Sequence, residues 1–281
     1  MPYEAAGGAA LALRAGASDG EARPVPFRGK GFRHKPLGFV SPLVFVAMIG
    51  LWELGSRSGV ISQIALPAPS QALVALVDLV HTGMLWKHLG ASLYRLAVGW
   101  TLGSLIGIGV GLLVGLFPFA RAALLPLVSA FFAIPKIALL PLFIVWFGVG
   151  EGSKVATILL GTFFPTAIAT CGGVDNVDRN LIRMGQSYGL SRLSIVRKII
   201  LPGALPAILS GFRISASLAI VLLVAAEMIG AEFGIGAYIL MAGSLFAIDQ
   251  LIAGVAILCT LGLTISFLIG RAERHFLSWR T

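Results

Sequence analysis

Three ionisable side chains of this 281-residue chain lie inside long apolar stretches. Lys136 directly follows Pro135, while Arg213 and Glu227 share one later stretch. If these stretches cross a membrane, each charge costs about 2.5–3.5 kcal/mol on insertion scales and should face protein or water. Pro135 also frees a backbone carbonyl one turn earlier. Two interpretations follow. In the first, each charged side chain has a structural partner inside the fold, which for Lys136 is Glu227 or the freed carbonyls. In the second, these side chains line a pathway for an anion.

Residues that could perform catalysis are not arranged for it. The four histidines all fall outside the apolar stretches: His34, His81, His88 and His275. Gly29-Lys30 is followed by Gly31, which lacks the hydroxyl that a phosphate-binding loop needs. The sequence therefore predicts a protein that is not an enzyme, with no catalytic, cofactor or metal site of its own.

The composition predicts an all-α polytopic membrane protein. Apolar residues make up 57% of the chain and charged residues only 12%, about half the charged share of a soluble domain. Residues 1–37 have no periodicity and predict a disordered basic cytoplasmic tail, and residues 38–280 predict one transmembrane domain. Six apolar segments are each about long enough to span the membrane, near 38–56, 92–117, 122–147, 154–173, 204–230 and 250–271.

The distribution of basic residues predicts the orientation. With the N-terminus inside, 15 lysines and arginines flank the spans on the cytoplasmic side, and only four lie outside: Arg57, Lys87, Arg95 and Lys154. Both ends of the chain are therefore expected in the cytoplasm. The net charge of +9 is explained by this topology, and because no aromatic residues interleave with the basic ones, no nucleic-acid partner is indicated.

An additional helix is expected on the outer membrane surface, between the first two spans. Pro67-Ala68-Pro69 breaks the chain and Ser70 can cap the helix that follows. Its apolar face is predicted to contain Leu73, Val74, Leu76, Val77 and Val80. Lipid is the expected partner of this face.

Residues 174–203 form the only sizeable cytoplasmic loop. Asn176 or Asp178 can cap a short helix through about Tyr188, and Gly189 can supply the left-handed residue that ends it. A second helical run from Ser191 then stops at Pro202. Two short helices at a turn make a knob that can seat in another protein. A solvated basic connector near anionic lipid is the alternative.

Four motifs together resemble one family of membrane proteins. They are Leu66-Pro67-Ala68-Pro69-Ser70, the run from Pro135 to Gly148, Leu201-Pro202-Gly203-Ala204-Leu205-Pro206 and Ala226-Glu227-Met228-Ile229-Gly230-Ala231. With the 174–203 loop, they resemble the permease subunit of ABC importers of the nitrate, sulfonate and taurine type. The resemblance implies a MetI-like type I importer fold with six transmembrane helices, in a bacterial inner membrane.

The resemblance implies partners and functional residues. A cytoplasmic ABC ATPase dimer, which binds ATP and Mg, would dock on the 174–203 loop, an extracytoplasmic solute-binding protein would deliver a small anion, and a second permease, as a homodimer, would complete the pathway. The coupling residues implied are Arg183, Met184, Gly185, Gly189, Ile199, Leu201 and Pro202. The loop departs from the family pattern at Arg183-Met184-Gly185, where Glu-Ala-Ala is usual. An ATP-independent secondary transporter or channel is the alternative function.

Overall fold

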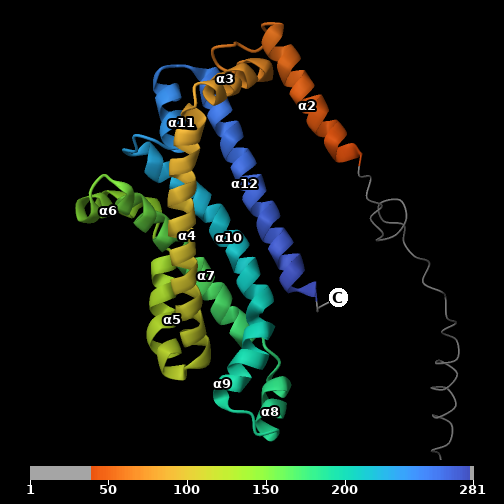
Figure 1. The fold of residues 1–281 in the computed structure, drawn as a ribbon, viewed down its shortest axis with the longest axis vertical. Helices are drawn as coiled ribbons and strands as arrows, with labels where there is room; N and C mark the ends of the chain where they lie inside the picture. Colours follow the sequence, from red (N-terminus) through yellow and green to blue (C-terminus); the bar gives the residue numbers. More distant parts are fainter. Residues whose placement is uncertain (1–38, 279–281) are drawn as a thin grey trace, which may run out of the picture. The chain divides into compact units, whose positions relative to one another are not determined.

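The computed structural model describes residues 39–278, so the predicted tail at 1–37 lies outside the described residues. Within that range the chain is helical and contains no strand (Figure 1). The α-helices are α2 (Val40–Arg57), α3 (Pro69–His81), α4 (Met84–Leu116), α5 (Pro118–Phe132), α6 (Leu140–Phe147), α7 (Glu151–Asp175), α8 (Arg179–Ser187), α9 (Arg192–Ile195), α10 (Leu201–Met228), α11 (Ile235–Ser244) and α12 (Ile248–Phe276). A 3-10 turn (Lys136–Leu139) precedes α6, and a π-helix (Val196–Ile200) joins α9 to α10. The chain divides after Gly50 into two units, and the packing described below belongs to the second.

Five helices in the described range are long and apolar enough to cross a membrane, and the number rises to six if a bent pair, α5 with Lys136–Phe147, is one span. The third expected span, near 122–147, corresponds to this bent pair. It bends by 91° between Phe132 and Lys136. Pro135 explains the bend, because proline disfavours helical backbone in the residue before it and cannot donate a helix hydrogen bond.

The tightest packing joins α4 to α7. Glycines recur every four residues along one face of α4, at Gly99, Gly103, Gly107, Gly111 and Gly115. They meet a matching row on α7, made of Ile158, Thr162, Thr166, Thr170 and Val174. At Gly107, a Cβ would lie only 2.7 Å from the carbonyl oxygen of Phe163. Only glycine permits this approach of the two backbones, as small residues do between transmembrane helices generally.

The expected outer helix forms as α3, but its cap and its packed face differ from the prediction. Ala68 is the N-cap residue, and its backbone N–H donates to the Gln71 side chain at 3.1 Å. Ser70 does not cap, because its hydroxyl donates to Glu53 at 2.7 Å. The face that packs on the protein consists of Ala72, Ala75 and Leu79. Of the predicted apolar stripe, Leu73, Val74, Val77 and Val80 are exposed.

The helix in the second half of the 174–203 segment does not stop at Pro202. It continues as one run from Arg192 to Met228. The π-helix explains how, since Leu201 N–H bonds to Val196 O, five residues back. This wider turn leaves room for a proline that would otherwise clash with a carbonyl four residues earlier.

Candidate functional site

The 174–203 segment folds into the predicted knob, at the opposite end of residues 51–278 from α3 and α11 (Figure 1). Asp178 caps α8, and its carboxylate accepts from the backbone N–H of Asn180 at 2.8 Å. Ser191 caps α9, where its hydroxyl oxygen accepts from the N–H of Ser194 at 3.3 Å. In each short helix, the side chain of the N-cap residue therefore satisfies a backbone donor of the first turn.

Gly189 ends α8 as the sequence predicts. Its φ is +72°, in the left-handed region that disfavours residues with a Cβ. Its N–H donates to Gln186 O at 3.0 Å, and Leu190 N–H donates to Gly185 O at 3.0 Å. These two bonds form a Schellman motif, which satisfies carbonyls that the helix end would leave unpaired.

A small apolar core fixes the knob to the spans. Ile195 and Ile200 are buried together with Val174, Val177 and Ala204 at the ends of α7 and α10. Gly185 is buried as well, and a Cβ there would lie 2.9 Å from the tip of Ile199. The knob is therefore packed rigidly on the bundle.

The outer surface of the knob combines apolar and basic side chains. Its exposed apolar residues are Leu181, Met184, Tyr188 and Leu193. Arg183 is exposed beside them on α8, and Leu201 and Pro202 are half-buried at the start of α10. Tyr188 is 81% exposed and Leu193 is 76% exposed, so the tip presents large apolar side chains beyond the bundle. Such a surface is typical of a protein contact.

Lys136 lies at the bend of the third span. Its Nζ donates to the carbonyl oxygens of Phe131 and Phe132 and lies 4.8 Å from the centroid of the Phe132 ring. The Phe164 ring centroid is 5.0 Å away. Of the two pairings expected for Lys136, the freed carbonyls are the one observed, and Glu227 has another partner. A half-buried ammonium beside two rings is stabilised by cation–π attraction.

Arg213 and Glu227 lie 14 residues apart on α10, which is about 21 Å along a helix. Arg213 pairs with Glu273 of α12 at 2.6 Å, and its side chain is 55% exposed. Glu227 is fully buried and pairs with Arg95 of α4 at 2.7 Å. The three charged residues that the sequence singles out therefore share no partner.

The charged cluster around Arg95 was not predicted from the sequence. Arg95 is 3% exposed and holds two acids at once. Its Nε and Nη2 donate to both oxygens of Glu151, each at 2.6 Å, and its Nη1 donates to Glu227 and to Phe233 O. This clamp joins the start of α7 to the end of α10, because a guanidinium presents donors on two edges.

The other partners of Glu227 complete the cluster. Its oxygens accept from the Ser92 hydroxyl at 2.8 and 3.0 Å and from Gly236 N–H at 2.9 Å. Lys154 is 3% exposed, and its Nζ donates to Val149 O at 2.5 Å and Gly150 O at 3.0 Å. Every charge in this cluster is thus hydrogen-bonded, as buried charges require.

One turn from Ser92, the His88 ring joins α4 to the start of α11. Its Nδ1 lies 3.1 Å from Gly234 N and its ring centroid lies 5.5 Å from that of Tyr238. Burial, together with the nearby Asp249 carboxylate, raises the pKa of the Tyr238 hydroxyl above its usual range. Tyr238 therefore stays neutral near pH 7 and packs as an aromatic residue.

A spacing signal could have revealed this cluster. His88, Ser92 and Arg95 continue the face of the glycine row toward the start of α4, at the intervals that stack side chains on one side of a helix. Hydropathy alone hides the signal, because polar residues lower it and move the expected start of the span to residue 92. The helix begins at Met84.

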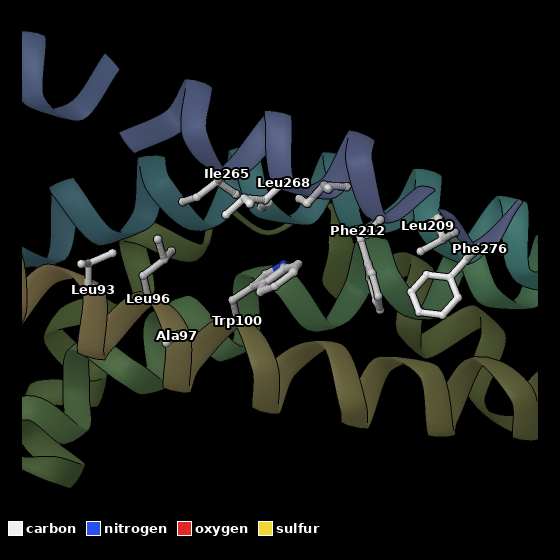
Figure 2. A pocket seen from close by; sticks show the side chains of 12 residues that line it. Leu93, Leu96, Ala97, Trp100, Leu209, Phe212, Ile265, Leu268 and Phe276 are labelled. Atoms are coloured by element: carbon white, nitrogen blue, oxygen red, sulfur yellow. The ribbon is translucent and has the colours of Figure 1, made fainter. Parts of the chain in front are cut away.

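A wholly apolar cavity of about 440 Å³ lies between α4, α10 and α12. Figure 2 shows Trp100 of α4 pointing toward it, with Phe212 of α10 and Ile265 of α12 along its lining. The Trp100 Nε1–H is already satisfied by Ser215 at 2.9 Å. With no charged group in its lining, this cavity offers nothing to hold an anion.

Comparison with known proteins matches residues 103–278 to the family described as binding-protein-dependent transport system inner membrane component. The chain is 36% identical over 237 residues to the taurine transport system permease protein TauC of Escherichia coli, covering 83% of this chain and 86% of TauC. It is 35% identical over 243 residues to the putative aliphatic sulfonates transport permease protein SsuC of Bacillus subtilis, covering 86% and 87%.

Among solved structures, the fold is similar to a chain of the MetNI methionine ABC transporter in inward-facing conformations. The TM-score is 0.61 at 23% identity, and the match covers 70% of this chain and 97% of that one. An amino acid ABC transporter chain matches with a TM-score of 0.56 at 19% identity, covering 71% and 97%. These similarities concern the arrangement of the helices in the membrane domain.

Proposed function

This chain belongs to the binding-protein-dependent transport system inner membrane components, as a permease of the ABC importer type, and we propose that its solute is a small organic anion with a sulfonate group. The solute class comes from the names of the two relatives, which transport taurine or are assigned to aliphatic sulfonates. Identity of 35–36% across most of both chains supports the transfer.

The proposed partners are an ATPase dimer and a solute-binding protein. ATP and Mg are bound by the ATPase, and the permease domain is completed by a second copy of this chain about a two-fold axis. The solute-binding protein docks on the extracytoplasmic side. The 15-to-four distribution of basic residues supports a cytoplasmic location for both termini and the α8–α9 knob.

The structure of the knob is the observation that supports an ATPase partner. It is anchored by buried residues, closed by a Schellman motif and tipped with exposed Tyr188 and Leu193. We propose that closure of the ATPase dimer moves two such knobs together and switches the pathway between inward-open and outward-open states. A rigid knob transmits such a movement as a discrete shift of packed elements.

Gly189→Val tests the docking role. The φ of +72° costs a residue with a Cβ roughly 1–2 kcal/mol, while the space around Gly189 is open. The variant should therefore insert normally but fray the end of α8 and release the ATPase in pull-down from membranes. Gly83→Val is the matched control, since Gly83 has the same φ of +72° and open space at the start of α4. Equal ATPase recovery from both variants contradicts the docking role.

Arg183→Glu tests the departure from the family's Glu-Ala-Ala pattern. If the ATPase carries an acid that faces Arg183, reversing the charge weakens docking. The yield of the complex should then fall more at low salt than at high salt, because salt screens the repulsion between the two acids. A yield that is unchanged at both salt concentrations removes Arg183 from the interface.

Uptake by the assembled system tests the transport proposal. Vesicles that contain the chain, its ATPase and its solute-binding protein should accumulate a short alkanesulfonate only with ATP. Uptake by the chain alone, driven by a solute or ion gradient, would instead identify a secondary transporter.

A further inference from the structure

Two buried cations border a cavity between α4, the start of α7 and the loop that joins α10 to α11. The cavity has a volume of about 430 Å³, and its lining includes Arg95, Glu151, Lys154, Glu232 and Phe233. Arg95 and Lys154 are each 3% exposed. Because an ionised side chain is costly to bury, each cation needs partners at this cavity: Arg95 pairs with Glu151 and Glu227, and Lys154 donates to the carbonyls of Val149 and Gly150.

The two acids that now neutralise Arg95 are held very differently. Glu227 is fully buried and accepts from Ser92 and Gly236 as well as from Arg95. Glu151 is 52% exposed, and among the described residues its carboxylate accepts hydrogen bonds from Arg95 alone. Glu227 is therefore a permanent partner, whereas Glu151 can turn into solvent at little desolvation cost.

Rotation of Glu151 away from Arg95 would create an anion site. The Nε–Nη2 edge of Arg95 would be free, and this flat edge fits two oxygens of a carboxylate, sulfonate or phosphate group. Among the buried groups, the charge would then be two cations, Arg95 and Lys154, against Glu227 alone, while Glu232 is exposed at the rim. One net positive charge favours a monovalent oxyanion over a neutral or cationic solute.

We propose that the Glu151 carboxylate occupies, as an internal substitute, a binding site for a small monovalent oxyanion formed by Arg95 and Lys154. This site deepens the proposed function and rests on it for the identity of the solute, since a sulfonate has the required charge and oxygens. The chain itself then recognises the head group of the solute. Glu151 closes the site when no anion is present.

Equilibrium binding of radiolabelled methanesulfonate to the full chain in nanodiscs of neutral lipid tests the site. Glu151→Gln keeps the shape but removes the competing charge, so the apparent affinity should rise about tenfold, as expected when a larger fraction of molecules has a free site. Lys154→Met should lower it by at least about tenfold, since one charge of the pair is lost. Glu232→Gln should raise it modestly, because Glu232 is an exposed acid at the rim.

Glu53→Gln is the matched control. Glu53 is another partly exposed acid that pairs with an arginine, Arg57, and it does not line this cavity. Its neutralisation changes the net charge by the same amount as Glu151→Gln. Methanesulfonate affinity should stay at the wild-type value in Glu53→Gln. If the affinity rises equally in Glu53→Gln and Glu151→Gln, the change in net charge alone explains the rise, and the proposed site is overturned.

A lipid phosphate has the same chemistry as the proposed solute, so the binding is repeated in nanodiscs with phosphatidylglycerol. Persistent methanesulfonate binding supports a soluble anion, and its loss reassigns the site to lipid and overturns the proposal. Unchanged affinity in both Glu151→Gln and Lys154→Met also overturns it. ATP-dependent uptake by the wild-type system is measured separately: uptake without these affinity changes rejects the site alone, and binding without uptake rejects the transport function alone.

Discussion

Arg95 holds together groups that lie 56 and 132 positions away in the chain, Glu151 and Glu227. Arg95→Gln leaves Glu227 buried without its cation and should cost about 3–5 kcal/mol of folding stability. The double variant Arg95→Gln/Glu227→Gln removes both charges and should regain a substantial part of this loss. Denaturation of the detergent-purified chain measures the difference. If the double variant is less stable than Arg95→Gln, the two charges do not compensate each other.

Lys136 contacts no carboxylate in the described structure, so its removal leaves no buried acid unpaired. Lys136→Met keeps the length of the side chain but removes the positive charge at the bend of the third span. If Lys136 lines the pathway, the complex should stay stable, its ATPase should still respond to the solute-binding protein, and uptake of the anion should fall about tenfold or more. Normal uptake by this variant would assign Lys136 a role only in the fold.

Local chemistry was predictable from single residues, whereas long-range pairing was not. The cap at Asp178 and the stop at Gly189 depend on neighbours within four positions, and both form as expected. The pairing of Arg95 with Glu227 depends on which faces of α4 and α10 meet. Packing along the whole helices determines which faces meet. As a result, Glu227 pairs with Arg95, and Lys136 donates to backbone carbonyls.

At the scale of elements, the glycine row of α4 sets its distance from α7. A Cβ at Gly103 would lie 2.5 Å from Leu159 O and would overlap the Thr162 hydroxyl. Gly103→Ala should therefore push the helices apart and destabilise the chain by about 1–3 kcal/mol. Gly109→Ala, on the open face of the same helix, should cause no loss. Thermal unfolding in detergent separates the two variants, and equal stability would contradict close backbone packing.

Span number follows from hydropathy, but the bounds and bends of the elements do not. The polar side chain of His88 is buried among helices, and α4 begins eight residues before the apolar window expected to start at 92. Pro135 bends the third span, while Pro202 is accommodated by a π-turn. Whether a proline breaks a helix thus depends on how neighbouring turns can adjust.

At the scale of the whole molecule, the proposed orientation places the 58–68 loop outside and the knob inside. Single cysteines at Val60 and Tyr188 suit the test, since these side chains are 84% and 81% exposed. A thiol reagent that cannot cross the membrane should label Val60→Cys in intact cells and should reach Tyr188→Cys only after the cells are broken. The unmodified chain, with Cys171 and Cys259, gives the background. Labelling of Tyr188→Cys from outside would reverse the topology.

The uninterrupted helix from Arg192 to Met228 has a mechanical consequence. Its 37 residues span about 55 Å, and it begins in the knob and ends one residue beyond Glu227. Such a rod acts as a lever: if it pivots at its lower end, a tilt of about 5° displaces the upper end sideways by about 5 Å, nearly one helical turn. A torque applied at the knob would therefore arrive, amplified in distance, at the charges clamped by Arg95.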